Sequence, residues 1–132
     1  MQEKSEDMGT WEPGTFDNDA ALDFINEEID RHISAIEAIF ADGERFCLDE
    51  DAEGELMPRV EILILLCESC HGVLPEELDS GRWKAQYLEM YDDQINGLEP
   101  SEEYKRQRRI SIAATFDRLI RLYEKQRQRN QA

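Results

Sequence analysis

The stretch DNDAALDFINEEIDRHISAIEAIFADG, residues 17–43, decides the fold because its apolar side chains recur every three or four residues. That period places them on one face of an α-helix and leaves the charged residues on the other. Asp17 or Asn18 suits the N-cap, and Asp19 adds a negative charge to the first turn. The Asp-Gly pair at 42–43 marks the end. The predicted core-facing residues are Leu22, Ile25, Ile29, Ile33, Ile36 and Phe40.

Downstream, Pro58 and Gly72 bracket a second apolar segment. Proline suits a first helical turn and glycine suits a C-terminal stop, so we expect a helix of about fourteen residues. Its interior, VEILILLC, could also be a buried strand. The length between the two breakers favours a central helix that is packed on several sides. Residues Pro75 to Leu78 are predicted to form a short turn of helix.

Two more helices follow from caps and stops. Asp79 or Ser80 caps a third helix, which Asn96-Gly97 ends. Ser101 caps the last helix, whose first turn is acidic and whose last turn is basic, as the helix dipole prefers. The third helix is predicted to bury Trp83, Tyr87, Tyr91 and Ile95, and the last helix to bury Ile112, Phe116, Leu119, Ile120 and Tyr123.

Four amphipathic helices without a strand pattern predict an all-α fold, a compact bundle of four main helices. The segment from Gly9 to Phe16 carries two aromatic residues around Pro13-Gly14 and is predicted to form an aromatic and glycine-rich turn before the bundle. Residues 1–8 are expected to be a flexible tail, and residues 9–132 a single acidic helical domain.

Composition narrows the class of protein. The chain has 132 residues, with 31 acidic and 15 basic side chains and a net charge of −16. Its longest apolar run, residues 62–67, is too short to cross a membrane, and the opening MQEKSED lacks the apolar core of a secretory signal. We therefore expect a cytoplasmic protein. Three cysteines fit reduced thiols better than a disulfide framework.

Charge is unevenly distributed along the chain. Residues 100–132 carry nine of the 15 basic side chains, whereas residues 1–57 carry 18 of the 31 acidic ones. We expect some basic side chains to pair within the last helix and others to face the acidic first helix. A chain this acidic repels phosphates, so nucleic acid is an unlikely partner.

Two patterns raise the possibility of bound metal. Residues 67–71, CESCH, match the C-x-x-C-H pattern of covalent haem attachment, and Cys47, Cys67, Cys70 and His71 are ligand types that zinc accepts. Residues 49–55, DEDAEGE, resemble the start of a calcium loop, but Val60 stands where a bidentate acid is required. We expect half-buried thiols, a solvated acidic loop and no cofactor. No catalytic motif is present, so no enzymatic activity is expected.

The stretch from Met8 to Asp23 resembles the opening of a family of small bacterial proteins, domain of unknown function 4259, with the pattern M-G-x-W-G-x-G-x-F-x-N-D-x-A-x-D. The matching residues are Met8, Gly9, Trp11, Gly14, Phe16, Asn18, Asp19, Ala21 and Asp23. Glu12 departs from the pattern. The resemblance extends to L-P-x-x-L at residues 74–78, to Trp83 and to the last helix. It implies a small acidic helical domain and no established activity.

These features predict a non-enzymatic acidic protein-binding module, in its sharpest form an inhibitor or immunity-type protein that neutralises a basic protein partner. The alternative is a metal-binding or enzymatic domain that uses Cys67, Cys70, His71 and the acidic loop. No membrane association is expected, and formation of a homo-oligomer stays open. The candidate binding residues are Trp11, Gly14, Phe16, Asn18 and Asp19 in the motif loop, and Asp49, Glu50, Asp51, Glu53 and Glu55 on an acidic face.

Overall fold

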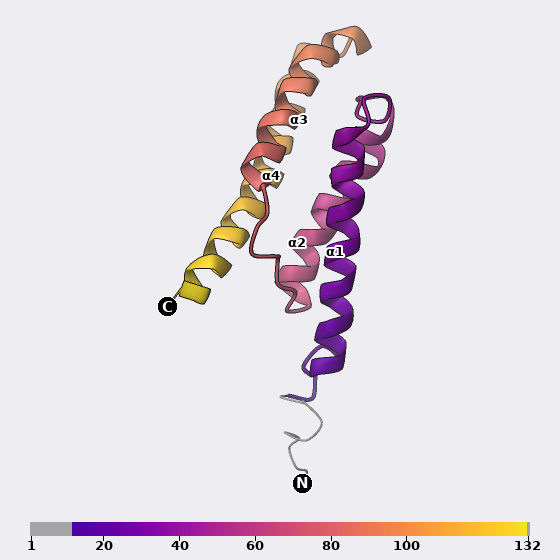
Figure 1. Ribbon diagram of the computed structural model, residues 1–132. Coiled ribbons are helices and arrows are strands. Elements are labelled where there is room, and N and C mark those ends of the chain that lie inside the picture. The colour runs from indigo at the N-terminus through magenta and orange to yellow at the C-terminus, as the bar shows by residue number, and fades with distance from the viewer. Residues whose placement is uncertain (1–11, 132) are drawn as a thin grey trace.

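The computed structural model describes residues 12–131, and within them the all-α prediction is confirmed (Figure 1). A π-helical turn, η2, precedes the second α-helix, and a 3-10 turn, η3, follows the third. The elements in chain order are α1 (Asp19–Ala41), η2 (Ala52–Leu56), α2 (Met57–Ser69), α3 (Ser80–Gln94), η3 (Ile95–Leu98) and α4 (Glu102–Gln131).

Helix α1 begins and ends close to where the sequence predicts. Asn18 is the N-cap, and its side-chain oxygen accepts the Ala21 N–H at 2.8 Å. Asp42 is the C-cap. Four predicted isoleucines are buried and Leu22 and Phe40 are half-buried, but the pattern missed Ile39, which is fully buried. The buried face of α1 is Ile25, Ile29, Ile33, Ile36 and Ile39.

Helix α2 holds the bundle together. It packs on α1 and on α4, while α3 packs on α4, so α2 lies between α1 and the α3–α4 pair (Figure 1). The prediction of a central helix is therefore confirmed. Burial on nearly all sides is wrong at Leu65, which is 56% exposed because its face of α2 is left open.

Aromatic side chains fill the space between α1, α3 and α4. The ring centroids of Phe40 and Phe46 lie 4.8 Å apart, and those of Phe46 and Tyr87 lie 6.0 Å apart. Tyr87 in turn lies 5.7 Å from Phe116 of α4. The predicted stripe of α3 is buried throughout, whereas in α4 three of the five predicted residues are buried and Ile120 and Tyr123 are half-buried.

The helical turn predicted at Pro75 to Leu78 is wrong, since residues 70–79 form an irregular connection. Its backbone N–H groups bond to side chains of distant helices instead of to a helical turn. Leu74 N–H donates to Gln126 of α4 at 2.8 Å, and Val73 N–H donates to Asn26 of α1 at 3.0 Å. These bonds fix the connection against both helices.

Gly72 ends α2 for a different reason than the sequence suggests. His71, not the glycine, adopts the left-handed backbone conformation, with φ of 63°. A Cβ on residue 72 would lie 2.5 Å from Ile29 Cδ1 and 2.9 Å from the Leu66 carbonyl oxygen. A glycine is needed here because α1 approaches the backbone closely.

Candidate interaction surfaces

The motif turn before α1 is held by its own polar side chains. Gly14 N–H donates to the Asp17 carboxylate at 3.1 Å, and a Cβ on residue 14 would collide with that carboxylate. Asn18 caps α1 and also donates to Thr15 O at 3.3 Å. Gly14 and Asn18 of the predicted motif loop therefore have structural roles, while Trp11 lies outside the described residues.

Contacts to the bundle fix this turn in place. Asp17 Oδ1 lies 2.9 Å from His71 Nε2, which joins the start of α1 to the end of α2. Phe16 is half-buried against the core, whereas Asp19 is exposed in the first turn of α1. Of the described motif residues, Asp19 is thus the one best placed to meet a partner.

The cysteines do not form a metal site within the described part of the chain. Cys47, Cys67 and Cys70 are free and half-buried, and nowhere between residues 12 and 131 do three His, Cys, Asp or Glu side chains gather around a point that could hold an ion. Burial raises the pKa of Cys67 to about 11. Its thiol therefore stays protonated near neutral pH and is a poor metal ligand or nucleophile.

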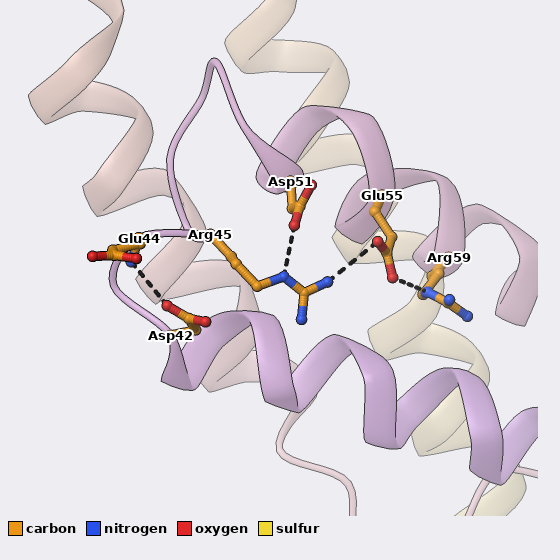
Figure 2. A network of polar contacts seen from close by, with 6 residues as sticks. All are labelled: Asp42, Glu44, Arg45, Asp51, Glu55 and Arg59. Atoms are coloured by element: carbon orange, nitrogen blue, oxygen red, sulfur yellow. Dashed lines mark hydrogen bonds and ion pairs between the residues drawn. The ribbon is translucent and has the colours of Figure 1, made fainter.

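The predicted acidic loop is partly helical, because residues 52–56 form η2 and lead directly into α2. Figure 2 shows why this stretch is ordered: Arg45 bonds to Asp51 at 2.6 Å and to Glu55 at 3.3 Å. Glu55 also pairs with Arg59 of α2 at 2.8 Å. The prediction of a solvated loop is wrong for η2, since ion pairs satisfy its carboxylates.

The five residues of the predicted acidic face separate into two groups. Glu53 accepts from Tyr87 and pairs with Arg108 of α4 at 2.8 Å, so it faces the bundle. Asp51 and Glu55 are held by Arg45. Asp49 and Glu50 alone are exposed and have no ion pair among the described residues. The five residues therefore do not form one solvent-facing surface.

The expected pairing within α4 is found between Arg106 and Glu103 at 2.7 Å, but no basic side chain of α4 pairs with α1 among the described residues, contrary to the prediction. Arg108 pairs with Glu53 of η2, Arg118 with Glu68 of α2 at 2.8 Å, and Arg109 with Asp92 of α3 at 2.8 Å. The packing order explains this, because α2 and α3, not α1, are the helices on which α4 packs. Acids of η2, α3 and α2 thus neutralise Arg108, Arg109 and Arg118, respectively.

Helix α1 is consequently left with an exposed negative face that the sequence analysis missed. We call it the acidic stripe, and none of its carboxylates has an ion pair within residues 12–131. Its signal in the sequence is acidic residues three, four or seven apart, on the side opposite the buried isoleucines. The stripe consists of Asp19, Asp23, Glu27, Asp30 and Glu37.

No family model, curated protein or solved structure matches this chain. The resemblance of the opening motif to the family named above therefore stays a prediction. In the described part of the chain, no helix combines the length and the apolar character that crossing a bilayer requires.

Proposed function

We propose that this chain is a non-enzymatic protein-binding module of the cytoplasm that uses the acidic stripe of α1 to bind a basic protein. In its sharpest form it is an inhibitor or immunity-type protein that neutralises this partner. The observation that carries the proposal is the contrast between α4, where acids of neighbouring elements pair with three basic residues, and α1, where five exposed acids stay unpaired among the described residues.

Repulsion between the carboxylates of the acidic stripe destabilises α1. Asp23 follows Asp19 by four residues, and Glu27 follows Asp23 by four. Like charges at this spacing destabilise a helix by roughly 0.2–0.5 kcal/mol per pair. A basic partner would relieve this repulsion, and the negative field would also speed its diffusional approach.

Apolar groups beside the acidic stripe add a means of anchoring a partner. Phe24 follows Asp23 directly and is 58% exposed, which is unusual for a large aromatic side chain. At the other end, Glu37 and Phe40 line a hollow of about 350 Å³ together with Trp83 of α3. A buried aromatic or aliphatic anchor inside a polar rim is the usual source of affinity in protein interfaces.

The test compares three full-length baits in a pull-down from cell extract. They are the native chain, the stripe-reversed variant (Asp23→Lys with Glu27→Lys) and a control variant (Glu89→Lys with Asp93→Lys). The control has the same change in net charge and the same spacing on exposed residues of α3. We expect the native chain and the control, but not the stripe-reversed variant, to recover a basic protein.

Association and dissociation rates then distinguish an acidic stripe that recognises a partner from one that only keeps the protein soluble. The recovered protein should associate with the native chain at a rate that falls steeply with salt, because exposed charges beyond about 8 Å are screened at physiological ionic strength. The stripe-reversed variant should lose association rate far more than it gains dissociation rate. Equal recovery by all three baits would refute the proposal, since the charge would then serve only solubility.

A further inference from the structure

Three basic side chains in the C-terminal half of α4 are not neutralised within the described molecule. Every other basic side chain among residues 12–131 makes an ion pair or a hydrogen bond. The chain has about twice as many acids as bases, so an unpaired base is scarce. The three exceptions are Arg121, Lys125 and Arg129, which lie four residues apart on one face of α4 and repel each other.

This row lines a groove between α4 and the end of α2, which we call the basic groove. Two adjoining hollows of about 530 and 380 Å³ share Glu68, Leu122 and Lys125. Arg121 lines the first hollow and Arg129 the second. The one α2 carboxylate in the groove, Glu68, is already paired with Arg118 at 2.8 Å. The acids that line the two hollows are therefore Glu68, which is already paired, and Glu124 of α4 itself, so α2 offers the three cations no free acid.

The acidic stripe repeats this geometry with the opposite sign. Asp19, Asp23 and Glu27 are also spaced i, i+4 and i+8, and a rise of 1.5 Å per residue gives both rows steps of about 6 Å and a span of about 12 Å. Within one chain the rows cannot meet. The acidic stripe points away from the α1 face that packs on α2, and the basic groove lies between α2 and α4.

We propose that the basic groove binds the acidic stripe of a second copy of this chain. An antiparallel arrangement of α1 on α4 pairs Asp23 with Lys125 and Glu27 with Arg121, with Asp19 opposite Arg129. Phe24, exposed beside the acidic stripe, then lies near the half-buried Leu122 in the groove. This is the helix-in-groove mode of recognition, with matched charge rows in addition to an apolar contact.

Self-association has a consequence for the acidic stripe, because a stripe seated in a neighbour's groove is unavailable to a basic partner. The groove of one copy would compete with that partner. The inference itself rests on the basic groove and does not require such a partner to exist.

The net charge of the chain determines how self-association should depend on salt concentration. Two chains of −16 repel each other at long range, and this repulsion is strong at about 0.01 M salt, where the screening length is about 30 Å. At about 0.15 M the screening length falls to about 8 Å, so only the groups that meet decide the association. We expect self-association to be strongest near physiological salt and to weaken again at about 1 M.

The decisive experiment is a charge exchange followed by sedimentation velocity of the full chain at about 0.15 M salt. The stripe-reversed variant should be monomeric, as should a groove-reversed variant (Arg121→Glu with Lys125→Glu). An equimolar mixture of the two variants should associate, because each reversed row then meets a row of opposite sign. The α3 control variant (Glu89→Lys with Asp93→Lys) should associate like the native chain.

Three results would overturn the inference: a native chain that stays monomeric up to about 1 mM, variants that associate as the native chain does, or a mixture of reversed variants that stays monomeric while both are folded by circular dichroism. A neutral variant, Arg121→Gln with Lys125→Gln, removes the two cations without adding acids and, when folded by circular dichroism, should also be monomeric. The groove variants should still bind a basic partner, so failure of self-association and failure of the proposed function are separate outcomes.

Discussion

The hydroxyl of Tyr87 donates a hydrogen bond to one carboxylate oxygen of Glu53 over 2.5 Å, and Arg108 pairs with the other oxygen at 2.8 Å. Three elements, η2, α3 and α4, therefore meet in one polar contact beside the aromatic core. Tyr87 is fully buried, and this burial, followed by the bond to Glu53, raises the pKa of its hydroxyl above the ordinary value of 10.

A pH dependence follows for Tyr87. The folded state keeps the Tyr87 proton while the unfolded chain loses it above pH 10, so the unfolded state binds fewer protons and the free energy of unfolding falls as pH rises. Stability from this group should be complete below about pH 9 and should then fall by up to about 1.4 kcal/mol per pH unit. Urea unfolding between pH 8 and 11 measures this, and Tyr87→Phe should flatten the profile. An unchanged slope in that variant would contradict the assignment.

Glu53 and Asp49 should differ sharply although both belong to the same acidic run. Glu53→Gln weakens the bonds to Tyr87 and Arg108 and should lower the free energy of unfolding by about 1.5–3 kcal/mol. Asp49→Asn changes an exposed residue without an ion pair among the described residues and should stay within about 0.5 kcal/mol. Chemical denaturation compares them. Similar values for both would mean that Glu53 is solvated.

The pKa of the His32 ring should lie below its ordinary value. Its Nδ1 lies 2.9 Å from an Arg59 guanidinium nitrogen, which makes Nδ1 the acceptor, and burial followed by the positive charge of Arg59 lowers the pKa of His32 below 6.5. The unfolded chain takes up this proton first, so stability is lost as pH falls below about 6.5. NMR titration of the ring should show a low midpoint that Arg59→Gln raises. A midpoint at or above 6.5 in the native chain would refute the contact.

Two glycines should respond to alanine in opposite directions. Gly72→Ala forces a methyl group against Ile29 and the Leu66 carbonyl and should destabilise the fold by about 1–3 kcal/mol. Gly81 lies in the first turn of α3 with open space around it, so Gly81→Ala should be neutral or stabilising by up to about 1 kcal/mol. Thermal unfolding of the two variants gives the comparison, and a neutral Gly72→Ala would mean that α1 can move away.

Truncation of the core should separate two apolar residues of α4. Phe116 is fully buried, and Phe116→Ala should cost about 3–5 kcal/mol, whereas Ile110 is 59% exposed and Ile110→Ala should cost less than about 1 kcal/mol. Equilibrium denaturation of each variant tests the buried face of α4. Loss of stability in both to the same degree would mean that the face is misassigned.

Local signals predicted most of the secondary structure. Asn18 and Ser101 cap their helices as expected, and the apolar periods of α1, α3 and α4 locate most of their buried residues. Ile39 was not predicted to be buried because a strict alternation of three and four residues selects Phe40. A helix with 3.6 residues per turn places both on the inner face, where Ile39 is fully and Phe40 partly buried. The connection at 70–79 could not be foreseen, because the Gln126 side chain that bonds Leu74 lies 52 residues away.

The candidate site was harder to predict because the sequence shows which residues are charged but not which residues they pair with in the fold. Glu53 and Asp49 look equivalent in the run DEDAEGE, yet one faces Tyr87 and the other solvent. Some basic residues of α4 were expected to face α1, and only the packing order reveals that Arg108, Arg109 and Arg118 pair instead with η2, α3 and α2. The acidic stripe and the basic groove can therefore be recognised only once the internal ion pairs are known, because they consist of charged side chains that these pairs leave unpaired.

The π-helical turn η2 makes this part of the chain sensitive to length. Each residue of an α-helix turns the chain by roughly 100°, so losing one residue within 52–56 would shift the helical side chains before the deletion by about that angle relative to α2. Gly54 has no neighbour for a Cβ within 4 Å, and substitution there should be tolerated. Its deletion should not be, because Glu53 and Arg45 could no longer both reach their partners. In descendants of this gene, position 54 should accumulate replacements but no gaps.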